Sequence, residues 1–478
     1  MSPSNRAALG ASLLLAACSV GPDFSRPQPP AAGAYASEAH PALDQAGGQL
    51  ALGQDPAAQW WTLFQSPALD SSMEQVLSGN RSLAAARATL AQAHEAVTAS
   101  GGALYPRIDA DAGIGRQKYG AEFSGPLVYP AFSYYAFGPS VSYVFDYTGG
   151  LQRAVEQQAA LADYQQYQLR AAQLSLSDGV AQQALAIASA RAQIAALQDL
   201  LADDQKNVEL VQTALQAGSA TRVDLLAAQS QLAGDETLLP PLHQQLAAAR
   251  HALAVLAGHA PADWTAPEFE LATLQPPLTL PLSLPSELAH RRPDILAAEA
   301  QLHAATAAVG VATSKLYPQI TLTASAGQQS TSPGHLFDAA STAWGLAGGL
   351  TAPLFDGGTL RAERRGAEDA RQAALASYEQ TVLQAFGQVA DALTALDHDA
   401  EQLAAQRKAL DSAEASLALT RESYAVGNSG ILQVIDAERL RQQAQLGYLK
   451  AQAQRSQDAV QLMLALGGGV PAADSAAR

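Results

Sequence analysis

The longest regular pattern in the chain is an apolar stripe that recurs every seven residues and occurs twice. The first copy comprises Val180, Ile187, Ile194, Leu201, Val208 and Leu215, and the second comprises Val389, Leu396, Leu403, Leu410, Leu417 and Tyr424. An apolar repeat of this length is typical of a coiled coil. The helix carrying the first copy is predicted to run from near Leu151 to Ala217, and at about 1.5 Å per residue it would be roughly 100 Å long.

Each long helix is expected to be followed by an antiparallel partner. In the first half the heptad spacing resumes after Thr221, at Leu225, Leu232, Leu239, Leu246 and Leu253. The turns between the helices, 218–220 and 427–430, contain the glycine that a helix C-terminus favours. Pro240 and Pro241 interrupt the returning helix. Because proline removes a backbone hydrogen bond at a cost of about 3 kcal/mol, we expect a kink or break there.

Four segments alternate between apolar and polar residues, as β-strands do. Their apolar positions are Ile108, Ala110, Ala112 and Ile114; Val141, Tyr143 and Phe145; Ile320, Leu322, Ala324 and Ala326; and Trp344, Leu346, Leu350 and Leu354. This pattern suits either a half-buried sheet or a membrane β-barrel. Since a barrel needs about eight strands or more, the membrane interpretation requires several chains to share one barrel. Tyrosine, phenylalanine and tryptophan cluster at these strands, as in an interfacial belt.

The same order of elements occurs twice because the chain is a tandem duplication. Tyr105 matches Tyr317 at an offset of 212 residues, and Gly218 matches Gly427 at an offset of 209. We expect repeats at 59–258 and 286–467, a proline-rich connector at 259–285 and a C-terminal tail at 468–478. Asp224 is interpreted as the acid of the first repeat that corresponds to Asp436 in the second.

The N-terminus has the features of a bacterial lipoprotein. An apolar run that is too short to span a membrane predicts a signal peptide over 1–17. It ends in Leu15-Ala16-Ala17-Cys18, which resembles the lipobox, and Cys18 is the only cysteine of the chain. We expect diacylglycerol and an N-acyl chain on Cys18, and an outer-membrane address at Ser19. The segment 18–58 is expected to be a loosely ordered, extended strap leading from the lipid.

Composition argues against nucleic-acid binding and against enzymatic chemistry. The chain has 44 acidic and 28 basic residues, a net charge of −16, so it lacks a basic surface for nucleic acid. Its single cysteine forms neither an internal disulfide nor a cysteine metal cluster. The nine histidines show no ligand spacing; His251 and His259, for example, are eight residues apart. We expect no catalytic site, no metal site and no cofactor other than the lipid.

Several short motifs occur in an order that resembles the outer-membrane factor family, the TolC-like channels, and within it the lipoprotein branch named for NodT and OprM. They are Trp60-Trp61, Leu104-Tyr105-Pro106, Arg291-Arg292-Pro293-Asp294-Ile295, Leu316-Tyr317-Pro318, Pro353-Leu354-Phe355-Asp356-Gly357-Gly358, Tyr424-Ala425-Val426-Gly427 and Asp436-Ala437-Glu438-Arg439. The resemblance covers essentially the whole mature chain. It implies an α+β membrane protein with long antiparallel coiled-coil helices and four transmembrane strands per chain.

The resemblance also implies an assembly and a function. Three chains would form a homotrimer with a 12-stranded barrel in the outer membrane and a periplasmic α-barrel. Such ducts passively export drugs and other small toxic molecules, which a periplasmic membrane-fusion adaptor and an inner-membrane pump of the resistance-nodulation-division class deliver. The chain would be lipid-anchored in the outer membrane and extend far into the periplasm.

Two groups of residues acquire roles from the resemblance. The family's gate pattern falls on Leu432, Asp436 and Arg439, where three leucines would narrow the pore and three carboxylates would repel one another and attract cations. The alternative is that Asp436 only favours a helix N-terminus and that Arg439 pairs with it three residues on. The adaptor-contacting helix tips are expected at Gly218, Ser219, Thr221, Gly427, Asn428 and Gly430.

Two other functions are compatible with the sequence. The chain could be a periplasmic coiled-coil scaffold lipoprotein whose alternating segments form a small soluble sheet. It could also keep the channel fold and export proteins, as type I secretion ducts do. Trimers in outer-membrane fractions and conductance in planar bilayers would distinguish a channel from a scaffold. The phenotype of a deletion strain would distinguish the export of small molecules from the export of proteins.

Overall fold

The computed structural model of the 478-residue chain describes residues 20–28, 34–35, 49–120, 130–277 and 279–468. Cys18 and Ser19, and the tail from 469 onward, lie outside the described residues. The chain divides into two compact units. The first comprises Met1–Pro27, Thr89–Gln166 and Ala297–Tyr378, and the second Gln28–Ala88, Tyr167–Leu296 and Glu379–Arg478.

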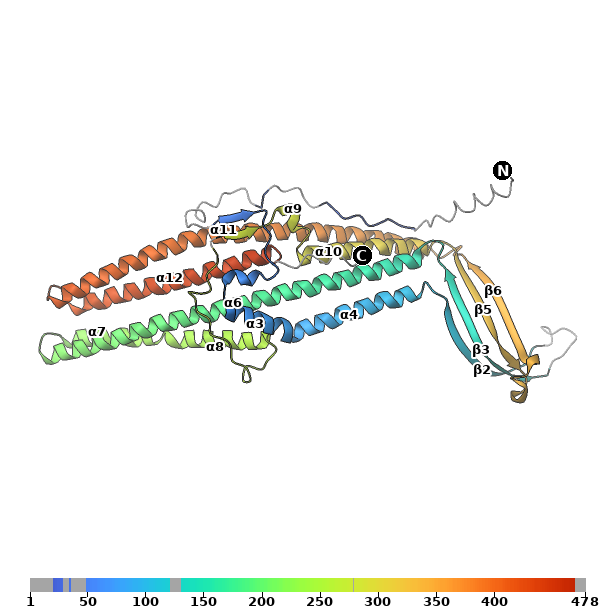
Figure 1. The fold of residues 1–478 in the computed structure, drawn as a ribbon, viewed down its shortest axis with the longest axis horizontal. Helices are drawn as coiled ribbons and strands as arrows, with labels where there is room; N and C mark the ends of the chain where they lie inside the picture. Colours follow the sequence, from blue (N-terminus) through green and yellow to red (C-terminus); the bar gives the residue numbers. More distant parts are fainter. Residues whose placement is uncertain (1–19, 29–33, 36–48, 121–129, 278, 469–478) are drawn as a thin grey trace. The chain divides into compact units, whose positions relative to one another are not determined.

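The first unit contains a four-stranded antiparallel sheet (Figure 1). Its strands are β2 (Arg107–Gln117), β3 (Phe132–Phe145), β5 (Gln319–Ser330) and β6 (Thr342–Thr351), in the order β2-β3-β5-β6. The four predicted strands are therefore confirmed, and β2 and β6 are the two edges of the sheet. One detail of the prediction is wrong: Leu354 lies beyond the end of β6, because Pro353 cannot donate to a strand ladder.

Cross-strand pairing separates the sheet into an apolar face and a polar face. Ile108 pairs with Val141, Val141 with Ala324, and Ala324 with Leu346, so one apolar row crosses all four strands. The neighbouring row has Asp109 opposite Ser140 and Ser325 opposite Gly345. Large apolar side chains on the sheet are exposed: Ile108 71%, Ile114 74%, Trp344 76%, Leu346 75% and Leu350 70%. An apolar sheet face this exposed marks an interaction surface.

The strands of the two repeats meet between β3 and β5, at two glycines. A Cβ atom on Gly327 would lie 2.5 Å from the carbonyl oxygen of Phe137 and 3.0 Å from Cα of Gly138. A Cβ on Gly138 would lie 2.3 Å from the carbonyl oxygen of Ala326. The pairing of the two repeats therefore depends on glycine at both positions.

Long helices leave the sheet and continue into the second unit. They are α6 (Gly150–Gln216) and α11 (Thr359–Ala425), each 67 residues long. In the second unit α6 is followed by α7 (Arg222–Glu236) and α8 (Leu239–Leu256), and these helices form one antiparallel hairpin. α11 is followed by α12 (Ile431–Ala465), and these two form a second antiparallel hairpin (Figure 1). Val180, Ile187 and Val389 of the heptad stripes are fully buried, which confirms the predicted coiled-coil packing.

The predicted break in the returning helix is confirmed. α7 ends at Glu236 and α8 begins at Leu239, so Pro240 and Pro241 lie in the first turn of α8. Prolines are tolerated there because the first amide groups of a helix have no intrahelical acceptor. The second repeat has no proline at this place, and α12 runs unbroken over 35 residues.

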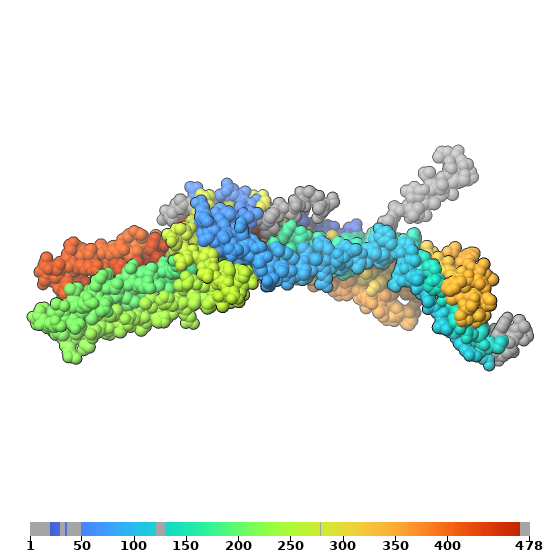
Figure 2. All heavy atoms as spheres, turned by 60° about the horizontal axis from the view of Figure 1, so that its bottom comes forward, coloured from blue at the N-terminus to red at the C-terminus, as the bar shows by residue number. Residues whose placement is uncertain are grey.

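The remaining elements precede the hairpins in each repeat. In the first repeat they are the 3₁₀ helix η1 (Trp60–Phe64), α3 (Pro67–Gly79) and α4 (Arg81–Gly102), and in the second α9 (Pro285–Leu288) and α10 (Pro293–Ser314). Asn80 Nδ2 donates to the carbonyl oxygen of Leu256 over 2.8 Å, so the end of α3 is held against α8. Figure 2 shows the blue segment that contains α3 in contact with the yellow-green segment that contains α8, on one face of the second unit.

A two-stranded parallel sheet was not predicted from the sequence. It pairs β1 (Gln49–Leu52), from the segment expected to be a loose strap, with β4 (Thr279–Leu282), from the connector. Ser283 and Tyr35 extend this contact, because the Tyr35 hydroxyl donates to the Ser283 carbonyl over 2.8 Å. These contacts hold Tyr35 and β1 of the predicted strap in place, so the prediction of a loosely ordered segment is wrong for these residues.

Among the described residues, one helix, α10, is long and apolar enough to cross a membrane. However, 67% of its apolar window is buried inside the protein. Burial of this extent is typical of a core helix that packs against other parts of the chain. The apolarity of α10 is therefore explained by internal packing.

Candidate functional site

The two hairpin turns that were predicted as helix tips have the same geometry. Gly218 and Gly427 both have φ of +76°, the left-handed conformation that glycine adopts without strain. Beyond them, the amide of Ser219 donates to the Ala214 carbonyl and the amide of Asn428 to the Ser423 carbonyl, each over 2.9 Å. These bonds close the last turn of α6 and of α11 in a Schellman arrangement.

The returning helices begin with matching caps. Thr221 Oγ1 accepts the amide of Asp224, and Asp224 Oδ2 accepts the amide of Thr221 over 2.8 Å. In the second repeat Gln433 Oε1 accepts the amide of Gly430 over 2.6 Å. The hydrogen bonds that the Asp224 carboxylate accepts from the Thr221 amide and the Thr221 hydroxyl hold the pKa of Asp224 below its usual range.

The caps correct the predicted equivalence of Asp224 with Asp436. Asp224 is the third residue of α7, and Gln433 is the third residue of α12, so the two capping side chains correspond. Asp436 is three residues further along α12 and caps nothing. The shift arises because the offset between the repeats has changed from 212 to 209 before this point.

Beneath the tips the two hairpins are joined by one apolar cluster. It comprises Val208 and Val211 of α6, Ala228 of α7, Leu417 of α11, and Ile431, Val434, Ile435 and Ala437 of α12. All four helices contribute, and Tyr424 and Leu225 pack against its margin. Burial of these side chains fixes the hairpins against each other.

A buried carboxylate stands next to this apolar cluster. Glu438 of α12 is 2% exposed, and it accepts a hydrogen bond from Asn207 of α6 and an ion-paired bond of 2.7 Å from Arg421 of α11. Arg421 also reaches Asp203 of α6 over 3.1 Å. Glu438 therefore connects three helices, and removal of its carboxylate would leave Asn207 buried without its acceptor.

Glu438, Arg421 and Asn207 were not singled out in the sequence as site residues. Glu438 lies seven residues after Ile431, at a heptad position where an apolar residue is expected. A charged residue at such a position is the signal that could have revealed the network. Its partners had no comparable signal, because Arg421 and Asn207 resemble ordinary polar residues of a helix surface.

A second polar pair lies in the α6–α7 hairpin. Asp204 is 3% exposed, and burial together with the neighbouring carboxyl of Asp235 raises the pKa of Asp204 to about 7. A similar pair joins α11 to α12, where burial and the carboxyl of Asp458 raise the pKa of Asp399 to about 7. Each hairpin thus holds a buried carboxyl that is protonated over part of the neutral pH range.

Raising the pH from 6 to 8 is therefore expected to lower the thermal stability of the protein. For an aspartate whose folded-state pKa is raised, the stabilisation is complete below about pH 4 and is lost as the pH rises through about 7. The loss is about 1 kcal/mol for each pair between pH 6 and 8, most of it occurs below pH 7, and the stability levels off at higher pH because the carboxyl is then ionised in both states. Melting curves at a fixed scan rate measure it. Asp204→Asn should reduce the fall in melting temperature with pH, and the double variant Asp204→Asn with Asp399→Asn should remove most of it. An equal dependence of melting temperature on pH in the wild type and both variants would contradict the prediction.

The predicted gate residues lie on the exposed side of α12. Leu432 is 45% exposed, and Arg439 donates to Asp436 Oδ1 over 2.7 Å, with side-chain exposures of 42% and 61%. The expected Asp436–Arg439 pairing is thus present, whereas Asp436, the sixth residue of α12, lies beyond the first turn, where a helix N-terminus favours an acid. An exposed pair contributes at most about 1 kcal/mol, so these charges are not needed for hairpin stability.

The described residues contain no group of three or more histidine, cysteine, aspartate or glutamate side chains that could hold a metal ion. The surface around the tips instead carries exposed apolar side chains, Val223 (71%), Leu226 (55%) and Val426 (71%). Exposed apolar residues at the ends of hairpins are suited to contact with another protein.

The fold defines a duplicated protein in which long helical hairpins join a four-stranded sheet with open edges. A family model described as outer membrane efflux protein matches residues 73–259 and 284–468. The chain therefore belongs to the outer membrane efflux protein family, whose members are efflux channels, and it is an outer-membrane component of an efflux system. This assignment confirms the resemblance found in the sequence and excludes the periplasmic scaffold.

Individual relatives agree with this assignment along almost the whole chain. The pyoverdine export outer membrane protein OpmQ of Pseudomonas aeruginosa is 32% identical over 477 residues, 98% of each chain. The probable outer membrane lipoprotein SilC of Salmonella typhimurium is 29% identical over 465 residues, 95% of this chain and 96% of its own. The solved outer-membrane channel OprN has a TM-score of 0.85 at 29% identity, covering 95% of this chain and 100% of its own.

Proposed function

We propose that three copies of this chain form a passive exit duct for small molecules. The apolar row across the sheet carries the proposal, because Ile108, Leu346 and their neighbours are exposed on one face and need an apolar environment. Four strands cannot close a barrel, whereas three chains supply twelve. With the order β2-β3-β5-β6, β6 of one chain would pair antiparallel with β2 of the next, and no open edge would remain.

In this assembly the repeats 59–258 and 286–467 contribute equivalent hairpins to a periplasmic α-barrel, and the connector 259–285 lies at its equator. The heptad stripes supply the packing between helices. Leu432, Asp436 and Arg439 form the gate, since they are exposed on α12 close to the turn and are not required for capping or for the core. Three Asp436 carboxylates around one axis repel one another and favour cations.

The exposed tips support an adaptor as the partner of the duct. A periplasmic membrane-fusion adaptor contacts the turns at Gly218, Ser219 and Thr221 and at Gly427, Asn428 and Gly430, beside the exposed apolar residues Val223 and Val426. An inner-membrane pump of the resistance-nodulation-division class supplies the transported molecules. The duct itself performs no chemical conversion and needs no cofactor.

Cys18 carries diacylglycerol and an N-acyl chain after removal of residues 1–17. The lipobox sequence supports this anchor, and the name of SilC, which is similar over 95% of this chain, describes a lipoprotein. Segment 18–58 then leads from the outer membrane along the protein. Protein export by the same fold is the competing function, but the name of OpmQ refers to pyoverdine export and not to protein secretion.

A deletion strain tested against a panel of antibiotics, dyes, detergents and solvents examines this function. We expect hypersensitivity to several small compounds, restored by the wild-type gene, and heat-resistant trimers with channel conductance from the outer-membrane fraction. Unchanged sensitivity together with the loss of a secreted protein would favour protein export. Absence of both trimers and conductance would contradict the duct.

A further inference from the structure

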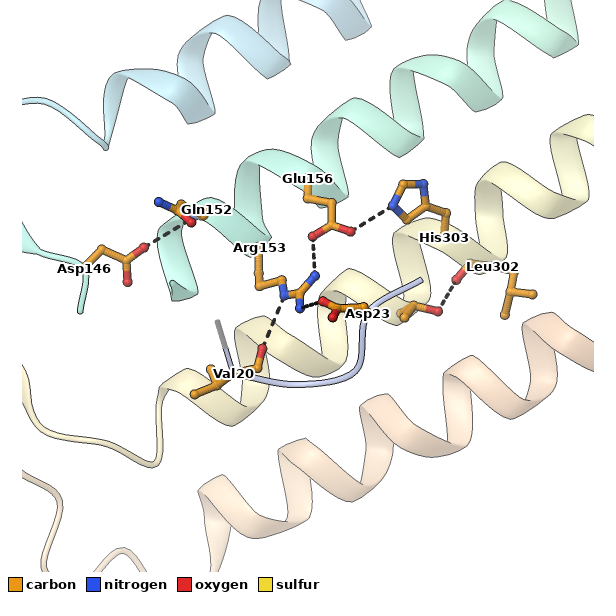
Figure 3. Close-up of polar contacts among 9 residues, drawn as sticks. Val20, Asp23, Asp146, Gln152, Arg153, Glu156, Leu302 and His303 are labelled. Carbon is orange, nitrogen blue, oxygen red and sulfur yellow. Dashed lines mark hydrogen bonds and ion pairs between the residues drawn. The ribbon is translucent and has the colours of Figure 1, made fainter. Parts of the chain in front are cut away.

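The first described residues of segment 18–58 are held firmly on the first unit. The amide of Val20 donates to the Thr148 carbonyl over 3.0 Å, and Arg153 Nε donates to the Val20 carbonyl over 3.3 Å. The same guanidinium forms an ion pair with Asp23, and a bond of 2.7 Å links it to Glu156 (Figure 3). The Arg153 side chain is only 6% exposed, so residues 20–23 cover it.

Two further contacts seat this segment against α10. A Cβ on Gly21 would lie 2.5 Å from Cα of Gly310, so the two backbones approach as closely as only glycine permits. Phe24 stacks on the ring of His303 at 4.3 Å, and His303 Nε2 lies 2.9 Å from Glu156 Oε1. The position of Val20 is therefore determined by contacts on both α6 and α10.

A cavity of about 500 Å³ lies where β3 and β5 meet α6, α10 and α11. Its walls are mostly apolar and include Val144, Phe145, Leu151, Ala154, Val311 and Tyr317. Thr148, whose carbonyl binds the amide of Val20, belongs to the same wall. Both the volume and the apolar lining are typical of sites for small apolar ligands.

The occupant with the shortest route to this cavity is the lipid of the chain itself. Cys18 precedes Val20 by two residues, which span at most about 7 Å in an extended chain. The contacts on Arg153 and Thr148 keep the start of that span at the cavity wall. A free phospholipid would have to enter without this tether, whereas a covalent chain is present at a high local concentration.

We propose that the cavity between the strand ends and the starts of α6 and α11 binds one acyl chain of the Cys18 lipid. The inference rests on the proposed lipidation of Cys18. The acyl chain then contacts Ala154 and Val311 and leaves the remaining chains for the membrane. Arg153 acts as a positioning residue, because it holds Val20 at the cavity through the Val20 carbonyl and Asp23.

Photocrosslinking of the full-length, membrane-extracted protein tests this proposal. Cells are grown with a fatty acid that carries a terminal diazirine, the purified protein is irradiated, and its peptides are mapped by mass spectrometry. We expect cross-links from the lipidated Cys18 peptide to peptides containing 144–154 or 311–319. A Cys18 peptide that bears acyl groups but cross-links only to lipid would overturn the acyl site and leave the anchor intact. An unmodified Cys18 would overturn the anchor and the acyl site together.

Paired variants on one helix test the site itself. Ala154→Trp fills the cavity and should lower the cross-link yield several-fold while the mass of the lipidated peptide is unchanged. Gln152→Trp, two residues earlier on an exposed side of α6, should leave the yield unchanged. Arg153→Ala should also lower the yield. Adducts on the cavity wall that persist in Cys18→Ser would identify a free phospholipid as the occupant and overturn the proposal.

Discussion

Gly327→Val is expected to abolish heat-resistant trimers in the outer-membrane fraction. The new Cβ would lie 2.5 Å from the Phe137 carbonyl oxygen, which is backbone and cannot move aside as a side chain can. Overpacking within a well-packed core costs typically about 1–3 kcal/mol, and a clash with backbone falls at the upper end or above it. Because β3–β5 is the pairing between the two repeats, its loss separates the sheet into two hairpins, which are marginal on their own.

Gly345→Val is the matched control for this change. Gly345 lies in the neighbouring strand β6, and a Cβ there would meet only Ser325 Oγ at 3.5 Å, an ordinary contact. Valine favours strands, so this variant should form trimers like the wild type. Semi-native gel electrophoresis of outer-membrane fractions compares the two proteins. Trimers of Gly327→Val at wild-type abundance would show that the close approach of the strands is not needed for assembly.

Asp436→Ala is expected to raise the closed-state conductance several-fold and to increase antibiotic entry in whole cells. In the proposed trimer the change would remove three negative charges from the proposed gate, and it frees Arg439 from its 2.7 Å ion pair. The preference for cations should fall as well, since the proposed ring of carboxylates would be its source. Single-channel recordings in planar bilayers measure the conductance, and reversal potentials in a salt gradient measure the ion selectivity.

Two companion variants separate the charge of Asp436 from its size and from general damage to the tips. Asp436→Asn keeps the size and removes the charge, so its selectivity should change like that of Asp436→Ala. Asp224→Ala removes an acid that caps α7, and its conductance should match the wild type. If closed-state conductance and selectivity are the same in Asp436→Ala as in the wild type, the gate does not include this residue.

The sequence by itself determined the helices and strands of this protein, because their patterns are local. The heptads placed α6 within one residue of its ends, and the alternation placed all four strands of the main sheet. Pro240 and Pro241 predicted the break between α7 and α8, since the loss of an amide donor acts wherever proline occurs. The ordered motifs were sufficient for the family.

Only the tertiary structure decided which distant residues meet. The pairing of β1 with β4 joins two four-residue strands far apart in the sequence, which are too short for a recognisable period. Glu438 accepts a hydrogen bond from Asn207, which is 231 residues away in the sequence. Arg153 donates to Val20 and Asp23, which are 130 residues or more away. A polar side chain has the same appearance in a sequence whether it is solvated or buried. Its partner, and therefore its role, is fixed by how the helices pack.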